Sequence, residues 1–212
     1  MKKFDIITEA DARVLDIGSS VELAKGGVVT PLAKDTLAAR RVTVVAAGLS
    51  DASLPSDLAP VADVRRVTIG SDHSGIALKK VLVQHLRGRG LAVLDVGTDK
   101  PDPVDYPDIA AAVAVSVARR EADAGIVIDG AGIGSAIAAN KIRGVRAAMC
   151  LDETTARYSR EHNGANVLAL GASLLAGTEA AVRIVDLWLG TPMREARYIR
   201  RLLKIRQLEE RS

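Results

Sequence analysis

From residue 67 onward, short apolar stretches alternate with longer segments whose apolar residues recur at helical spacing. The expected strands are residues 67–69, 91–97, 125–129, 145–151 and 166–170. The expected helices are residues 75–90, 107–121, 135–142, 152–163, 177–190 and 192–210. This alternation predicts a parallel sheet with helices on both faces. We therefore expect an α/β fold, a Rossmann-like three-layer sandwich around a five-stranded parallel sheet.

The first part of the chain follows a different pattern. Residues 21–45 are compatible with a small β-unit that includes one short helix. Residues 48–66 are rich in Ser, Asp, Pro and Ala, which is typical of a linker. We therefore expect an N-terminal extension and linker over residues 1–65 and one main domain over residues 66–212.

Composition narrows the class of protein. Hydrophobic residues make up 48% and charged residues 26% of the chain, as in a soluble globular protein. The apolar runs are too short for a membrane span, no apolar leader precedes the domain, and Cys150 is the single cysteine, so we expect a cytoplasmic protein. The net charge is only +3 and aromatic residues are 2%, which argues against a nucleic-acid partner.

Polar or glycine-rich sequence follows three of the expected strands. The stretches are GSDHSG at 70–75, DGAGIG at 129–134 and LDE at 151–153. In parallel α/β sheets a ligand binds outside the carboxyl ends of the strands. The sequence therefore predicts a binding site at this edge of the sheet.

The glycine-rich loop is open to three interpretations. Gly130, Gly132 and Gly134 lie between an apolar strand and a helix, where backbone N–H groups can hold a phosphate or an oxyanion. The loop could also be a tight turn without a ligand. A dinucleotide fingerprint requires a third glycine at position 135, where Ser135 stands.

Other candidate residues also have a structural alternative. Asp72 and His73 can face one site from a loop, or Asp72 can cap the next helix. His162 near a helix end is either an acid–base group or a complement to the helix dipole. Arg197, Arg200, Arg201 and Lys204 share a helix face that suits a phosphate or is simply solvated. No cluster has metal-ligand spacing.

Five stretches resemble the ribose-5-phosphate isomerase B and galactose-6-phosphate isomerase family. They are GSDHSGIALK, DYPDIA, GAGIGSAIAANKIRGVRAA, SREHNGANVLALG and the arginine-bearing tail after WLG. The resemblance implies interconversion of aldose and ketose phosphates through a cis-enediolate, without a metal or cofactor. It also implies dimers or tetramers whose active sites combine residues of two subunits.

The resemblance also implies roles for individual residues. His162 would open the sugar ring and Asn163 would contact the sugar. Backbone amides of the loop would stabilise the enediolate oxygen. The implied substrate-binding residues are Asp72, His73, Tyr106, Gly130, Ala131, Gly132, Ile133, Gly134, Ser135, Asn163, Arg197 and Arg201.

Three departures from the family pattern concern the same site. Asp129 stands where many ribose-type members carry a cysteine base, and Ser135 stands where others use a glutamate. Ala131 replaces a common threonine or serine, and Ser173 replaces a phosphate-binding arginine. We expect Asp129 to be the base. The alternatives are a protein without turnover that binds sugar phosphates, and a subunit that needs a partner chain, as in galactose-6-phosphate isomerase.

The first 65 residues faintly resemble N-terminal segments of bacterial microcompartment enzymes, including ethanolamine-utilisation adenosyltransferases. This resemblance implies encapsulation in a protein shell and contacts with shell or co-encapsulated proteins. An oligomerisation arm or a flexible leader is the alternative.

Overall fold

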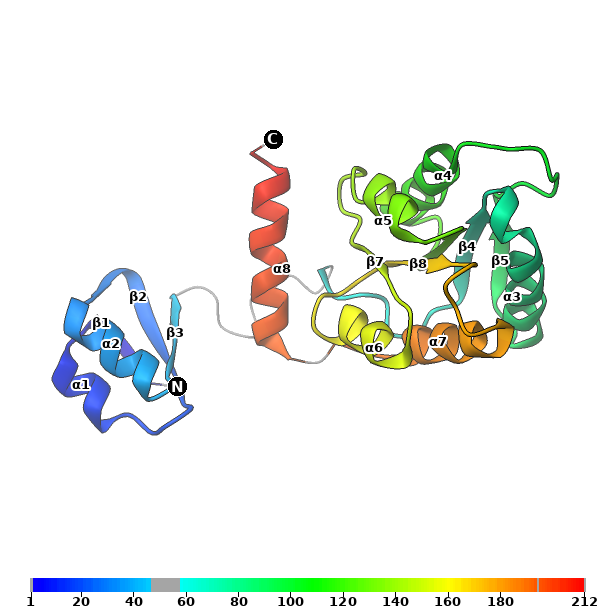
Figure 1. Ribbon diagram of the computed structural model, residues 1–212. Helices are drawn as coiled ribbons and strands as arrows, with labels where there is room; N and C mark the ends of the chain where they lie inside the picture. The colour runs from blue at the N-terminus through cyan, green and yellow to red at the C-terminus, as the bar shows by residue number, and fades with distance from the viewer. Residues whose placement is uncertain (1, 47–57, 194, 212) are drawn as a thin grey trace. The chain divides into compact units, whose positions relative to one another are not determined.

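The computed structural model describes residues 2–46, 58–193 and 195–211 (Figure 1). The chain divides into two compact units, residues 1–54 and 55–212. Each unit has its own strands and its own core, and each is described by itself. Among the described residues, no helix combines the length and the apolar character that a membrane crossing requires.

The first unit is a small parallel β-sheet with two helices. Its elements are β1 (Lys3–Ile7), α1 (Glu9–Val14), β2 (Ser20–Val29), α2 (Pro31–Ala39) and β3 (Thr43–Ala46). The strand order is β1-β2-β3, and both neighbouring pairs are parallel. Thr8 and Thr30 cap the two helices, and Ile7, Ala12 and Leu37 are buried between helices and sheet. The sequence led us to expect one helix in this unit, where the structure has two.

The second unit contains the five-stranded sheet that the sequence predicts. Its strands are β4 (Arg66–Ser71), β5 (Ala92–Asp95), β6 (Ala124–Asp129), β7 (Ala147–Met149) and β8 (Val167–Gly171). Its helices are η3 (His73–Gly75), α3 (Ile76–Gly88), α4 (Tyr106–Ala118), α5 (Ile133–Ala139), α6 (Glu153–Glu161), α7 (Thr178–Gly190) and α8 (Ala196–Glu209). The order is β5-β4-β6-β8-β7, with every pair parallel.

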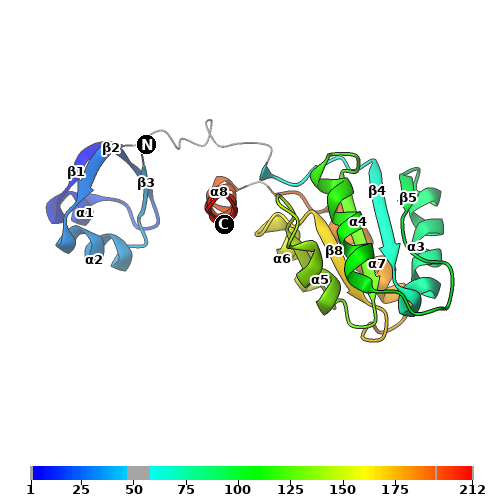
Figure 2. The same cartoon turned by 90° about the horizontal axis from the view of Figure 1, so that it is seen from above.

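Helices cover both faces of this sheet (Figure 2). Ile126 and Ile128 of β6 belong to a core that also contains residues of α3, α6 and α7. Val127, which points to the other face, belongs to a core with residues of α4 and α5. The predicted three-layer α/β sandwich is therefore confirmed.

Two helices begin at least two residues away from the start that the sequence predicts. α5 begins at Ile133 rather than at Ser135, because Gly132 takes the left-handed conformation (φ 77°) and serves as the N-cap. α8 begins at Ala196 rather than at Pro192. By contrast, Asp152 caps α6 as the sequence predicts, and its side chain accepts a hydrogen bond from the Thr155 N–H.

Residues 58–66 form a strap on the second unit. The second unit therefore begins at residue 55, earlier than the boundary near residue 65 that the sequence predicts. Leu58 is buried with Met193, Tyr198 and Leu202, the last two on α8. Arg146 donates to the Leu58 carbonyl, and the buried Arg160 donates to the Val61 carbonyl. These contacts explain why this stretch of the expected linker is part of the domain.

Candidate functional site

The carboxyl ends of β4, β6 and β8 meet through backbone hydrogen bonds. The Asp72 N–H donates to the Ile128 carbonyl, and the Ala172 N–H donates to the Asp129 carbonyl. The glycine-rich loop lies between these strand ends. A side chain at Gly132 would place its Cβ 2.9 Å from the backbone N of Gly171, which explains why this position is glycine.

The Asp129 carboxylate fills part of the cradle that the loop makes. Its Oδ1 accepts hydrogen bonds from the Ala131 and Gly132 N–H groups, and its Oδ2 accepts one from the Ser135 N–H at 2.9 Å. We expected all the backbone N–H groups of residues 131–135 to be available to a substrate oxygen. Those of Ala131, Gly132 and Ser135 donate to Asp129 instead. Within the described structure, the N–H groups of Ile133 and Gly134 in the first turn of α5 have no acceptor, as is usual for a helix start.

Two opposing effects set the charge of Asp129. Burial works to raise the pKa of this carboxyl, but hydrogen bonds from Ser135, Gly132 and Ala131 outweigh burial and hold the pKa below its ordinary value. Asp129 is therefore ionised at neutral pH. Oδ2 accepts the Ser135 N–H, and the Ser135 side chain makes the largest of the hydrogen-bond contributions that lower this pKa.

Cys150 is not an alternative base at this edge. Its side chain is fully buried behind β7, and burial raises the pKa of its thiol. A buried neutral thiol is inert, because the thiolate is the reactive form. Asp129 is thus an ionised side chain at the loop, whereas the Cys150 thiol is neutral.

The three predicted residues around the loop gather at the same edge. Asp72 caps η3 through the Ser74 N–H, as the structural alternative proposed, and its Oδ2 has no hydrogen-bond donor among the described residues. His73 is exposed, and its Nδ1 accepts the Val104 N–H at 3.4 Å. The Tyr106 ring lies against Gly134, where an added Cβ would approach the ring to 2.5 Å. These side chains frame the space over the glycine-rich loop.

A second group surrounds His162. The imidazole stacks between the rings of Tyr158 and Tyr198, each with a centroid 4.6 Å away. Arg197 donates to the Tyr198 hydroxyl, and the Arg201 guanidinium lies over the same ring. Asn163 donates to the Tyr158 carbonyl. The structure therefore brings together His162 and the two arginines.

The two groups lie at opposite edges of the sheet. α6 starts beside the carboxyl end of β7 and returns to the amino edge, where His162 follows it and Arg146 binds the Gly164 carbonyl. A six-residue strand such as β6 spans ~20 Å. The predicted site requires His162 close to Asp129. Within one chain these two side chains lie at opposite ends of the strands, so one chain does not bring them together.

The comparisons with known proteins concern the second unit. Residues 67–205 match the Ribose/Galactose Isomerase family. The chain belongs to this family. Ribose-5-phosphate isomerase B of Escherichia coli is 44% identical over 148 residues, which cover 70% of this chain and 99% of that protein.

Solved structures agree with the family assignment. The Clostridium thermocellum ribose-5-phosphate isomerase B is 46% identical and superimposes with a TM-score of 0.67, over 69% of this chain and 98% of that one. The Mycoplasma genitalium enzyme with bound ribulose-5-phosphate is 38% identical, also with a TM-score of 0.67, over 69% and 97% of the chains. The second unit is an isomerase domain of this type.

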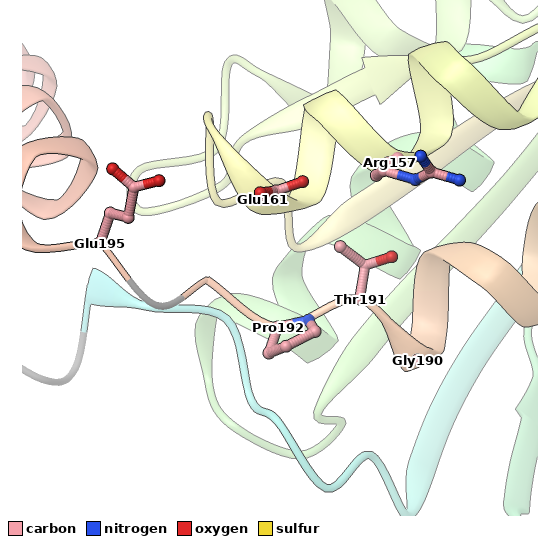
Figure 3. Close-up of a pocket in the computed structure, with 6 residues that line it drawn as sticks. All are labelled: Arg157, Glu161, Gly190, Thr191, Pro192 and Glu195. Atoms are coloured by element: carbon pink, nitrogen blue, oxygen red, sulfur yellow. The ribbon is translucent and has the colours of Figure 1, made fainter.

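The isomerase domain has a cavity of about 510 Å³ beside the His162 group (Figure 3). Arg157 and Glu161 of α6 line one side, and Gly190, Thr191, Pro192 and Glu195 line the other. None of the predicted site residues lines this cavity. Asn163, one of the predicted site residues, lines a different cavity, of about 350 Å³.

Sequence reasoning missed the aromatic stack on His162. Tyr158 lies four residues before His162 on the same helix, so the spacing carries a usable signal for this contact. Tyr198 carries no such signal, because its contact with His162 depends on how α8 packs.

Proposed function

We propose that this isomerase interconverts ribose 5-phosphate and ribulose 5-phosphate. The observation that carries the proposal is the ionised, nearly buried Asp129 carboxylate in the glycine-rich loop, at the same end of the sheet as Asp72, His73 and Tyr106. Incubation with ribose 5-phosphate should yield the ketose. Allose 6-phosphate and galactose 6-phosphate are the comparison substrates that define the specificity.

Proton transfer between neighbouring carbons explains the arrangement around the loop. Asp129 Oδ2 takes the proton from the carbon beside the aldehyde and returns it to the aldehyde carbon, while the hydroxyl proton on the carbon that lost its hydrogen moves to the former aldehyde oxygen. The N–H groups of Ile133 and Gly134 donate to the enediolate oxygen at the start of α5, where the helix dipole favours negative charge. Three amides that hold Asp129 also keep its carboxylate in place for both transfers.

Ring opening and phosphate binding are assigned to the second group. His162 acts as the acid–base group, Asn163 contacts the sugar, and Arg197 and Arg201 bind the phosphate. Since this group lies at the opposite sheet edge from Asp129, we infer a homodimer, or a tetramer built from such dimers. In it, the loop of one copy meets His162 and α8 of a second copy.

Phosphate binding by the arginines predicts a selective loss of affinity. Replacing Arg197 or Arg201 by alanine should raise KM for ribose 5-phosphate by about 10- to 100-fold, because each removes a charge-assisted hydrogen bond. Turnover of unphosphorylated sugars should change little. Arg206 to alanine, on the last turn of α8, is the matched control. An equal effect on phosphorylated and free sugars would contradict phosphate binding at these residues.

A specific observation also favours a second function, binding without turnover. The lowered pKa of Asp129 makes its carboxylate a weak base. In this case the protein is a sugar-phosphate sensor, or a subunit of the galactose-6-phosphate isomerase kind that needs a partner chain. Saturable binding of ribose 5-phosphate with no ketose formed would favour the sensor, and activity that appears only with a second chain would favour the subunit.

We propose for the first unit a role in bacterial microcompartments. Its own buried core, with Ile7 and Ala12, supports an independently folded module that could dock on a shell or on co-encapsulated enzymes. Deleting residues 1–54 should abolish co-purification with shells and leave isomerase turnover within about twofold, because the second unit has its own sheet and buried core.

A longer deletion serves as the matched comparison. Removing residues 1–65 also removes the strap, so Tyr198 and Leu202 lose Leu58, and Arg160 loses the Val61 carbonyl. We expect this variant to lose turnover as well. Shell co-purification that survives deletion of residues 1–54 would exclude the targeting role and favour the oligomerisation arm.

A further inference from the structure

Lys79 is a buried charged residue without a role in the proposed reaction. It lies on α3, and none of its side chain is exposed. Its Nζ lies 2.8 Å from an oxygen of Asp95 and 3.1 Å from Asp99 Oδ1. A buried lysine needs a carboxylate partner, and Asp95 at the end of β5 already supplies one. The second carboxylate therefore requires another explanation.

Asp99 belongs to the segment of residues 96–105, which we name the β5–α4 loop. Its side chain is 67% exposed, yet it reaches inward to Lys79. The first part of the loop runs against β4. The Thr98 N–H donates to the Ser71 carbonyl, and an added Cβ at Gly97 would lie 2.3 Å from the Ser71 backbone N. The loop is thus fixed against β4 at its start and tied to α3 by Asp99.

The other end of the β5–α4 loop contacts the proposed site. The Val104 N–H donates to His73 Nδ1 at 3.4 Å. Since Nδ1 accepts, a neutral His73 carries its hydrogen on Nε2, which leaves this N–H as a donor at the exposed side chain. Tyr106, at the first position of α4, lies against Gly134. The position of the β5–α4 loop therefore affects the tautomer of His73 and the placement of Tyr106.

We propose that Lys79, Asp95 and Asp99 form a clasp that positions the β5–α4 loop, so that His73 presents its Nε2–H and Tyr106 covers the glycine-rich loop. Lys79 and Asp99 are positioning residues, because neither contacts the space over the loop. The clasp also explains why a partly exposed aspartate is ordered on a buried ammonium that already has a partner. This inference rests on the proposed function for its effect on turnover, but the effect on His73 is independent of it.

Asp99 to asparagine is the sharpest test, because the Lys79–Asp95 pair remains and the fold should be retained. We expect KM for ribose 5-phosphate to rise about two- to fivefold, as a partly exposed ion pair allows, with a smaller change in kcat. ¹⁵N NMR of the imidazoles should show His73 shifting from the single Nε2–H tautomer towards a mixture. The chain has only three histidines, so their signals can be assigned.

Lys79 to methionine is the second variant and should have the larger effect on both readouts, because it leaves two carboxylates facing each other. Lys34 to methionine is the control, since Lys34 is an exposed lysine on α2 of the first unit. Unchanged His73 signals and unchanged KM in Asp99→Asn would overturn the clasp. If the wild-type protein turned over no sugar phosphate, the proposed function would fail, but the His73 tautomer would still test the clasp. Failure of the clasp and failure of the proposed function are therefore distinguishable.

Discussion

Replacing Asp129 by asparagine is expected to lower kcat for ribose 5-phosphate by about 10²- to 10⁴-fold, the usual contribution of a positioned base. The amide keeps the size of the carboxylate but cannot accept a proton from carbon. Its NH₂ group would also face the Ser135 N–H, which now donates to Oδ2. Ketose formation under saturating substrate, with the melting temperature recorded alongside, measures the loss.

Asp123 to asparagine is the matched control for this variant. Asp123 is also a carboxylate that accepts two backbone N–H groups, from Arg65 and Arg66, and its pKa is also lowered, although burial opposes this. It lies before β6, at the amino edge of the sheet, so its loss should affect stability and leave turnover intact. Undiminished turnover in Asp129→Asn would remove Asp129 as the base.

Mixing two inactive variants is expected to restore activity. An Asp129→Asn protein and a His162→Gln protein should each be inactive alone. If each site combines Asp129 of one copy with His162 of the other, a mixed dimer has one intact site and one doubly altered site. Random exchange in an equal mixture makes half of the dimers mixed, so activity should reach about a quarter of the wild-type value.

The control for this experiment is a mixture in which both variants affect the same half of the site. Asp129→Asn mixed with Tyr106→Phe should gain nothing beyond the activity of the latter, because these residues lie at one edge of one chain. Native mass spectrometry, with one variant isotope-labelled, confirms that subunits exchange. Failure of the first mixture to recover activity after proven exchange would contradict the shared site.

The sequence predicted the layers of the fold better than the contacts of the site. Apolar periodicity gives the five strands and most of the helices, because a buried parallel sheet needs continuous apolar runs. A local signal likewise identified Asp152 as a helix cap. Contacts between residues distant in sequence carry no such pattern, and the Arg160 bond to the Val61 carbonyl joins residues that local sequence does not relate.

Asp129 illustrates why the site was only partly predictable. The spacing of the glycines indicates an anion cradle, and the structure has one. Which anion occupies the amides depends on the side-chain direction at the end of β6, and periodicity does not give this direction. Similarly, the motifs identify His162 and Asp129 as candidates, but only the course of α6 shows that they lie at opposite edges.

If the proposed dimer forms, the separation of the two half-sites by the length of a strand has a thermodynamic consequence. A substrate that bridges two copies binds the assembled form and not the isolated chain, so it stabilises association by linkage. Specific activity should then decline on dilution below the dissociation constant of the dimer, and added substrate should shift this decline to lower protein concentration. Under the dimer proposal, the activity of this isomerase therefore depends partly on its local concentration.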